Sequence, residues 1–113
     1  MTAPYLPARR AGDWLVLSGQ IGLGPVGLAD TFEDQLRQAL ANMDDLLTAN
    51  GANSAQVTKA TVFLTDMDDY AAMNEIYTGY FAEPRPARTC VAVAGLPLGA
   101  LVEIEAWAYT GDA

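Results

Sequence analysis

The chain has 113 residues, with 14 acidic and six basic side chains, a net charge of −8, one cysteine and no histidine. The length suits one domain over residues 1–113, and the acidic charge argues against a nucleic-acid partner because phosphate backbones repel it. A disulfide within the chain, a Cys/His zinc site and every mechanism that needs an imidazole base are excluded.

Charged residues make up only 18% of the chain, against 51% apolar residues. A small monomer usually carries more charge on its surface, so we expect another subunit to cover part of the apolar surface. No apolar run approaches the ~20 residues that span a bilayer. The first ten residues also lack the apolar stretch of a signal peptide. The default expectation is therefore a cytoplasmic protein with no membrane partner.

The N-terminal part of the chain is predicted to be extended. Residues 1–10 contain two prolines, and the apolar run Trp14–Ser18 predicts a strand that Gly19–Ile21 continues. The absence of alternation in this run predicts burial on both faces. The glycine-rich stretch Gly22–Gly27 is superficially similar to a phosphate-binding loop, but it lacks the P-loop lysine and the dinucleotide spacing. We interpret it as a turn.

Two helices are predicted. The first has Asp30 as N-cap and Glu33 at the position of a capping box, and it ends at Asn50-Gly51. The strand Val57–Thr65 follows, and Asp66 then opens the second helix, which Pro84 ends. Apolar side chains recur at helical spacing in both helices: Phe32, Leu36, Leu40, Met43 and Leu47 in the first, and Tyr70, Met73, Tyr77 and Tyr80/Phe81 in the second.

The stretch Pro86–Val93 is predicted to be a strand with an arginine near its start. Alternation places Arg88, Cys90 and Ala92 on one face. A buried charge is costly unless an anion meets it. Arg88 therefore either faces water from an edge strand, where it blocks aggregation, or it binds an anion.

The element order β-β-α-β-α-β-β predicts an α/β (α+β) fold, a mixed β-sheet with both helices packed on one face, because two helices cannot cover both. In the last strand, Leu101–Tyr109, one set of residues is predicted to face the helices and the other to point away: Val102, Ile104, Ala106 and Ala108 inward, and Glu103, Glu105, Trp107 and Tyr109 outward. A face that carries two large aromatic rings is too apolar for water, so we expect it to meet another subunit.

Several side chains could support chemistry. Arg88 can hold a carboxylate or phosphate through two parallel hydrogen bonds, and Glu105 can act as a general acid or base. Tyr5, Ser18 and Asn74 offer hydrogen bonds, and Cys90 offers a thiol. Ordinary roles remain open for them: solvated strand residues for the glutamates, a strand end for Ser18, a polar helix face for Asn74, and a small buried hydrophobe for Cys90, which no histidine can activate.

An ordered set of motifs runs along the whole chain. The most distinctive are Pro86-Ala87-Arg88, Leu96-Pro97 and Val102-Glu103-Ile104-Glu105-Ala106; further ones are Pro4-Tyr5, Leu17–Ile21, Thr61–Leu64 with Asp66, and Met73-Asn74 with Tyr77 and Phe81. With these motifs the chain resembles the Rid (reactive intermediate deaminase) family, also called the YjgF family.

The resemblance implies a homotrimer with a chorismate-mutase-like fold and three clefts between subunits. It also implies cofactor-free hydrolysis of enamine/imine intermediates, such as 2-aminoacrylate and its imine tautomer, to 2-oxo acids and ammonia. Arg88 matches the family arginine that binds the substrate carboxylate, and Glu105 matches the acid that positions water. Residues at five further positions match the pocket of the family: Tyr5, Ser18, Gly19, Asn74 and Cys90.

Two alternatives remain open. A non-catalytic trimer whose clefts hold small carboxylates would need Arg88 equally, and Glu105 is what favours catalysis over it. A ribonuclease, an activity attributed to some relatives, is disfavoured by the charge of −8 and the absence of histidine.

Overall fold

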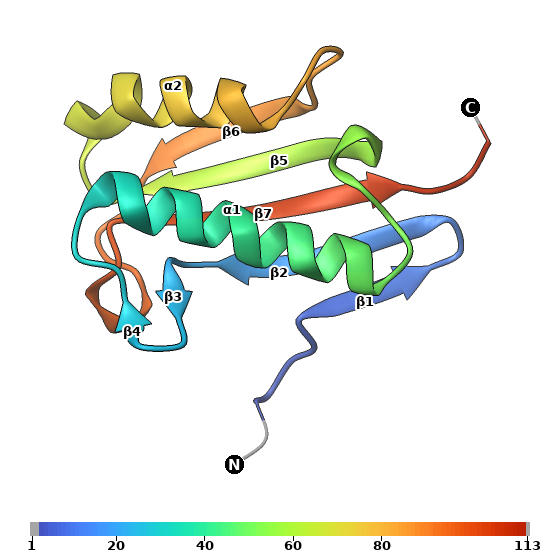
Figure 1. Cartoon of the computed structure of the whole chain (residues 1–113), viewed down its shortest axis with the longest axis horizontal. Coiled ribbons are helices and arrows are strands. Elements are labelled where there is room, and N and C mark those ends of the chain that lie inside the picture. Colours follow the sequence, from blue (N-terminus) through green and yellow to red (C-terminus); the bar gives the residue numbers. More distant parts are fainter. Residues whose placement is uncertain (1–2, 113) are drawn as a thin grey trace.

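The computed structural model describes residues 3–112. Its main feature is a five-stranded mixed sheet of order β1-β2-β7-β5-β6, with a separate short hairpin, β3-β4 (Figure 1). The strands are β1 (Ala8–Ala11), β2 (Trp14–Gln20), β3 (Leu23–Gly24), β4 (Gly27–Leu28), β5 (Val57–Leu64), β6 (Ala87–Ala92) and β7 (Val102–Tyr109). Neighbouring strands are antiparallel except for β5 and β6, which run parallel and are joined through a helix.

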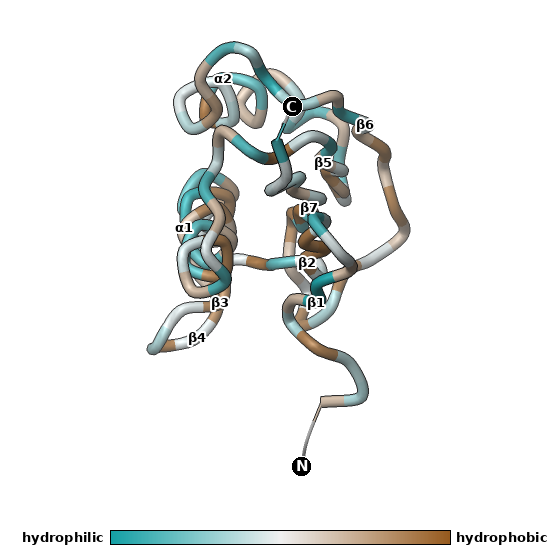
Figure 2. Tube along the Cα trace, turned by 90° about the vertical axis from the view of Figure 1, so that its right-hand side faces the viewer, coloured by the Kyte–Doolittle hydropathy of each residue, from teal (hydrophilic) through white to brown (hydrophobic). Residues whose placement is uncertain are grey.

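The two helices, α1 (Phe32–Ala49) and α2 (Tyr70–Tyr80), lie side by side on one face of the sheet, as Figure 2 shows from the side. The prediction of two helices on one face of a mixed sheet is therefore confirmed. The other face of the sheet is left without helices. Within residues 3–112, neither helix is long and apolar enough to cross a membrane.

The N-terminus of α1 differs from the prediction by one residue. Thr31, not Asp30, is the N-cap, and its hydroxyl oxygen accepts a hydrogen bond from the backbone N–H of Asp34 at 3.1 Å. Thr31 has the extended backbone that a cap requires. Asp66 does cap the start of the second helical segment, where it leads into a 3₁₀ turn, Met67–Asp69, that precedes α2.

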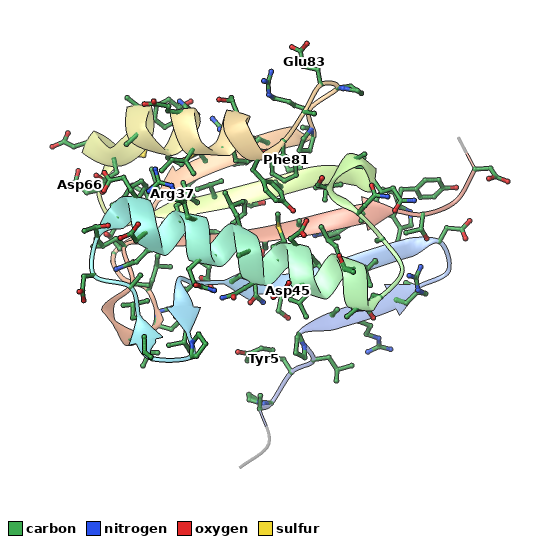
Figure 3. All side chains as sticks on the ribbon, in the orientation of Figure 1. Tyr5, Arg37, Asp45, Asp66, Phe81 and Glu83 are labelled. Atoms are coloured by element: carbon green, nitrogen blue, oxygen red, sulfur yellow. The ribbon has the colours of Figure 1, made fainter. Side chains whose placement is uncertain are left out.

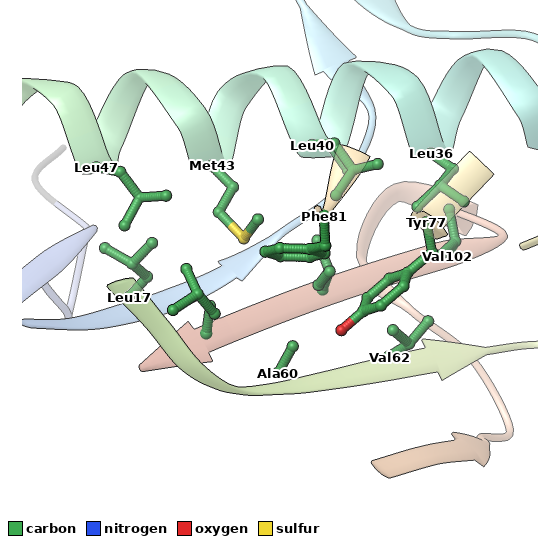
Figure 4. Close-up of a cluster of buried hydrophobic side chains, with 14 of the residues drawn as sticks. Leu17, Leu36, Leu40, Met43, Leu47, Ala60, Val62, Tyr77, Phe81 and Val102 are labelled. Carbon is green, nitrogen blue, oxygen red and sulfur yellow. The ribbon is translucent and has the colours of Figure 1, made fainter. Parts of the chain in front are cut away.

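Strand β7 is central, because it pairs with β2 on one side and β5 on the other. Its burial alternates as predicted, with Val102, Ile104, Ala106 and Ala108 fully buried beneath the helices. These residues pack against the apolar stripe of α1 and against Tyr77 and Phe81 at the end of α2, as Figure 4 shows. The core thus fixes which face of every strand points toward the helices.

The predicted extended N-terminal segment contains the first strand, β1, of the predicted element order, but two details of the N-terminal half differ from expectation. Strand β2 alternates, with Leu15 and Leu17 buried but Trp14 37% exposed, so it is not buried on both faces in this chain. The stretch Gly22–Gly27, interpreted as a turn, contains most of the β3-β4 hairpin.

Candidate functional site

Arg88 lies on β6, at one edge of the sheet, and its side chain contacts α2 on the helix-covered face. Its Nη2 donates a hydrogen bond to the hydroxyl oxygen of Tyr70 at 3.2 Å, and Nη1 lies 3.5 Å from the sulfur of Met73. The guanidinium carbon is 4.8 Å from the ring centroid of Tyr77 and 5.7 Å from that of Tyr70. Contacts of a cation with aromatic faces at these distances are attractive, so α2 fixes the position of the guanidinium.

No carboxylate of the described chain pairs with Arg88. Within residues 3–112 the ion pairs are Arg37 with Asp34 and Arg85 with Glu83, and Arg88 takes part in neither. A half-buried guanidinium keeps donors free for an external anion when its neighbours are rings and a thioether. The structure therefore favours the anion-binding interpretation over an edge-strand charge that points into water.

Two other predicted pocket residues belong to the same two elements, β6 and α2. Cys90 follows Arg88 on the same face of β6, because these residues pair with Val62 and Ala60 of β5, which are buried beneath the helices. Burial raises the pKa of the Cys90 thiol, and the charge of Arg88 only partly opposes this. The thiol is therefore less ionised than an ordinary cysteine at neutral pH, which suits a pocket wall rather than a nucleophile. Asn74 is half-buried on α2.

The hydroxyl of Tyr77, whose ring contacts Arg88, is an unexpected feature near this arginine. Tyr77 is only 3% exposed, and its hydroxyl has no hydrogen-bond partner among residues 3–112. In Figure 4 this hydroxyl points from α2 toward β5, near Val62. Burial raises its pKa, and the charges of Arg88 and Arg85 partly offset the rise. Helical periodicity marked Tyr77 as a core residue and gave no signal for its contact with Arg88.

Glu105 and Glu103 lie on β7, on the face without helices, and both are half-buried. Burial raises the pKa of Glu103, and the neighbouring charge of Glu105 raises it further. Gly19 gives the Glu103 carboxylate its space, because a Cβ atom at residue 19 would lie 2.5 Å from Glu103 Oε2. Of the two glutamates on this face, burial therefore perturbs the carboxyl of Glu103.

Ser18 lies on β2 and contacts the N-terminal segment that contains Tyr5. The hydroxyl of Ser18 donates to the carbonyl of Leu6 at 2.6 Å, and the backbone N–H of Ser18 donates to the carbonyl of Pro7 at 2.8 Å. Ser18 therefore anchors the segment that carries Tyr5, whose side chain is 62% exposed. Figure 3 shows Tyr5 beyond β1, on the opposite side of the molecule from α2.

The sheet separates Arg88 from Glu105 within one chain. Arg88 pairs with Ala60 and Ala60 with Ala106, all on the covered face; Glu105 pairs with Thr61, on the open face. The candidate residues thus fall into two groups, which we call the half-sites. The arginine half consists of Arg88, Cys90, Asn74, Tyr70 and Tyr77, and the glutamate half consists of Glu105, Glu103, Gly19, Ser18 and Tyr5. No single face holds both.

Comparisons with known proteins agree with this architecture. A family model described as "Endoribonuclease L-PSP" matches residues 1–110. A RutC family protein of Pyrococcus horikoshii is 45% identical over 94% of this chain and 86% of its own. A 2-iminobutanoate/2-iminopropanoate deaminase of Mus musculus is 40% identical over 96% of this chain and 82% of its own.

Solved structures share the fold. A RidA from an Antarctic Psychrobacter superposes with a TM-score of 0.92 at 37% identity, covering 96% of this chain and 90% of that one. Escherichia coli TdcF with bound serine superposes with a TM-score of 0.91 at 35% identity, covering 98% and 91%. Because the family model and these relatives each match nearly the whole chain, the protein belongs to the Endoribonuclease L-PSP family, which is the Rid (YjgF) family.

Proposed function

We propose that this protein hydrolyses small 2-imino acids to 2-oxo acids and ammonia without a cofactor. The observation that carries the proposal is the guanidinium of Arg88, which α2 holds in place and which pairs with no carboxylate of residues 3–112. The deaminase name of the mouse relative and the serine bound to TdcF support a small carboxylate-bearing ligand. A cytoplasmic location and a single Rid-like domain over residues 1–113 are part of the proposal.

In the proposed reaction, Arg88 holds the substrate carboxylate through two parallel hydrogen bonds and so orients the imine carbon. Glu105 accepts a proton from water as the water oxygen bonds to that carbon, and the C=N bond becomes a single bond. Glu105 passes this proton to the nitrogen and then transfers the proton of the new hydroxyl to it as well, so the C–N bond breaks as the carbonyl forms and the nitrogen leaves as ammonia. The balance is one imine and one water consumed, and one 2-oxo acid and one ammonia released.

In the proposed site the two half-sites come from different copies of the chain, and their separation by the sheet in each copy supports this arrangement. We propose a homotrimer in which the open sheet face of one subunit approaches the β6 edge of the next. The aromatic cluster on the open face supports such burial: Trp14 contacts Trp107 and Tyr109 with centroid distances of 6.4 and 5.1 Å, and Trp107 is 49% exposed.

The name of the family model also raises ribonuclease activity. The residues of this chain favour the deaminase instead. The net charge of −8 repels phosphate backbones, and the chain has no histidine for the acid–base steps of RNA cleavage. A trimer that only binds small carboxylates would use Arg88 in the same way, and measurement of turnover separates it from the enzyme.

The test generates 2-iminopropanoate in the cuvette with an amino-acid-consuming enzyme and follows ammonia release with and without this protein. We expect release to accelerate in proportion to protein concentration, and light scattering coupled to size exclusion should give three chains per particle. Unchanged release together with 2-oxo acid binding would favour the binding module. A stable monomer would rule out the site between subunits.

A further inference from the structure

A hollow of about 740 Å³ lies between α1 and α2, and it shares no lining residue with either half-site. We call it the interhelix groove. Its α1 wall runs from Glu33 through Leu40 and Ala41 to Asp44, and its α2 wall runs from Ala72 to Tyr80. Residues on both walls recur at helical spacing, so each wall is one continuous stripe of its helix.

The floor of the interhelix groove is apolar and its walls are low. Leu40 and Ile76 line it together with the small residues Ala41, Ala72 and Gly79. Gly79 has an ordinary helical backbone, and a Cβ atom built there would meet nothing within 4 Å. Glycine within a helix carries a stability cost relative to alanine. No contact within residues 3–112 requires that cost, whereas glycine permits the close approach of another backbone.

The rim of the interhelix groove is acidic. Glu33, Asp44 and Glu75 line it, against one cation, Arg37, which is paired with Asp34 at 3.5 Å. The carboxylate of Asp44 accepts a hydrogen bond from the hydroxyl of Tyr80 at 2.7 Å and so stays fixed at the wall. Figure 3 shows Arg37 between the two helices, at the end where both begin.

Further acidic residues strengthen the negative charge at this end of the groove. Asp69 stands at the start of α2, and its pKa is raised by burial and by the charges of Asp66, Glu33 and Asp68. A side chain whose pKa responds to three neighbouring carboxylates lies in a negative potential. The groove is therefore complementary to a cationic occupant with an apolar face.

We propose that the interhelix groove binds a short amphipathic helix of a partner protein, with an apolar stripe flanked by Lys and Arg. Its longer wall extends over twelve residues of α1, from Glu33 to Asp44, which is roughly 17 Å or three turns. Helices dock into such grooves through apolar residues at positions i, i+3, i+4 and i+7. Another copy of this chain is a poor occupant, because α1 carries a single arginine against four acidic residues and α2 carries no basic residue.

The probe is a fluorescein-labelled helical peptide of leucine and lysine, with the leucines in one stripe. A peptide of the same composition with the stripe scrambled is its control, and binding is followed by fluorescence anisotropy at two salt concentrations. We expect saturable binding of the striped peptide alone, weakened by salt. Equal binding of both peptides, or no saturable binding, would overturn the proposal.

Three variants locate the contact. Glu33→Lys/Glu75→Lys reverses the rim and should weaken binding roughly tenfold. Asp45→Lys/Asp112→Lys changes the net charge equally at exposed residues outside the groove, and it should bind as the parent does. Figure 3 shows Asp45 on the side of α1 away from α2. If both double variants weaken binding equally, net charge alone explains it and the groove is excluded.

The third variant, Gly79→Leu, fills the hollow without changing charge. The open space above Gly79 and its helical backbone let a leucine fit, so thermal unfolding should show a fold at least as stable as the parent. Peptide binding should still weaken roughly tenfold, because the apolar floor is blocked. A stable Gly79→Leu protein that binds the peptide like the parent would show that the occupant does not enter the groove.

Discussion

The two half-sites differ in how the chain holds them. Arg88 is fixed on the helix-covered face by the rings of Tyr70 and Tyr77, so its half is complete in one folded chain. Glu105 lies on the uncovered face, next to Glu103, and its surroundings depend on what covers that face. In the proposed mechanism, a single chain therefore positions the arginine that binds the anion, whereas the surroundings of the glutamate that activates water depend on a neighbouring subunit.

The largest expected effect is at the glutamate half. Glu105→Gln keeps the size and one acceptor oxygen but cannot take a proton, so turnover of 2-iminopropanoate should fall about 10²- to 10⁴-fold. Binding of a 2-oxo acid through Arg88, measured by calorimetry, should persist, because the arginine half is intact.

Glu103→Gln is the matched control on the same strand, and we expect it to stay active. The assignment would be wrong by two residues if Glu103→Gln were inactive and Glu105→Gln active. If both variants turned over normally, no carboxylate base would be needed and the binding-module alternative would gain support.

At the arginine half, Arg88→Lys should lower kcat/KM roughly ten- to a hundredfold. Lysine keeps the charge but cannot form two parallel bonds to a carboxylate, and one charge-assisted contact contributes about 1.5–3 kcal/mol. Steady-state ammonia release measures the change, and circular dichroism verifies the fold. Parent-like activity in a folded Arg88→Lys protein would mean that Arg88 does not anchor the carboxylate.

Mixing the two inactive proteins tests the separation directly. When Arg88→Lys and Glu105→Gln chains are co-refolded in equal amounts, about a quarter of the sites between subunits should combine an intact arginine half with an intact glutamate half. Activity should therefore rise well above that of either variant refolded alone. If each chain carried its own complete site, the mixture would show only the average of the two.

A smaller effect is expected at the residue that positions Arg88. Tyr70→Phe removes the oxygen that accepts a hydrogen bond from Nη2 and keeps the ring. One such bond contributes about 0.5–1.5 kcal/mol, so KM should rise roughly two- to tenfold while kcat changes little. A fall in kcat at unchanged KM would assign Tyr70 to the chemical step instead.

The smallest effect concerns stability and pH. Because burial and Glu105 raise the pKa of Glu103 in the folded state, folding favours its protonated form. The associated stability is fully present below the ordinary pKa and is lost as pH rises through the raised pKa. Glu103→Gln should therefore raise Tm relative to the parent at pH 7 and not below about pH 4. An equal Tm difference at both pH values would contradict this origin.

Sequence reasoning predicted the fold well where periodicity carries the information. The alternation in β7 placed Ile104 and Ala106 inward and Trp107 outward, and the structure confirms all three. It failed where two adjacent residues offered the same chemistry: Asp30 and Thr31 can both cap α1, and only the backbone geometry selects Thr31.

The candidate site was less accessible to sequence reasoning. The sequence of β6 shows that Arg88 and Cys90 share a face, but not which face the helices cover. That depends on the strand order and on the register of β5 with β6 and β7. The same limit hid Tyr70 and Tyr77, because their contact with Arg88 is between distant segments. Gly19 matched a pocket position, and its proximity to Glu103 emerged only in three dimensions.

The position of β7 has a consequence for how the protein folds during synthesis. This strand forms the hydrogen bonds of both β2 and β5, yet it is made after every other strand. Until it emerges from the ribosome, β2 and β5 each present an unpaired edge that can pair with another nascent chain. The sheet is therefore completed only after translation of Val102–Tyr109. The contacts that complete it join residues distant in sequence, and such contacts favour slow folding.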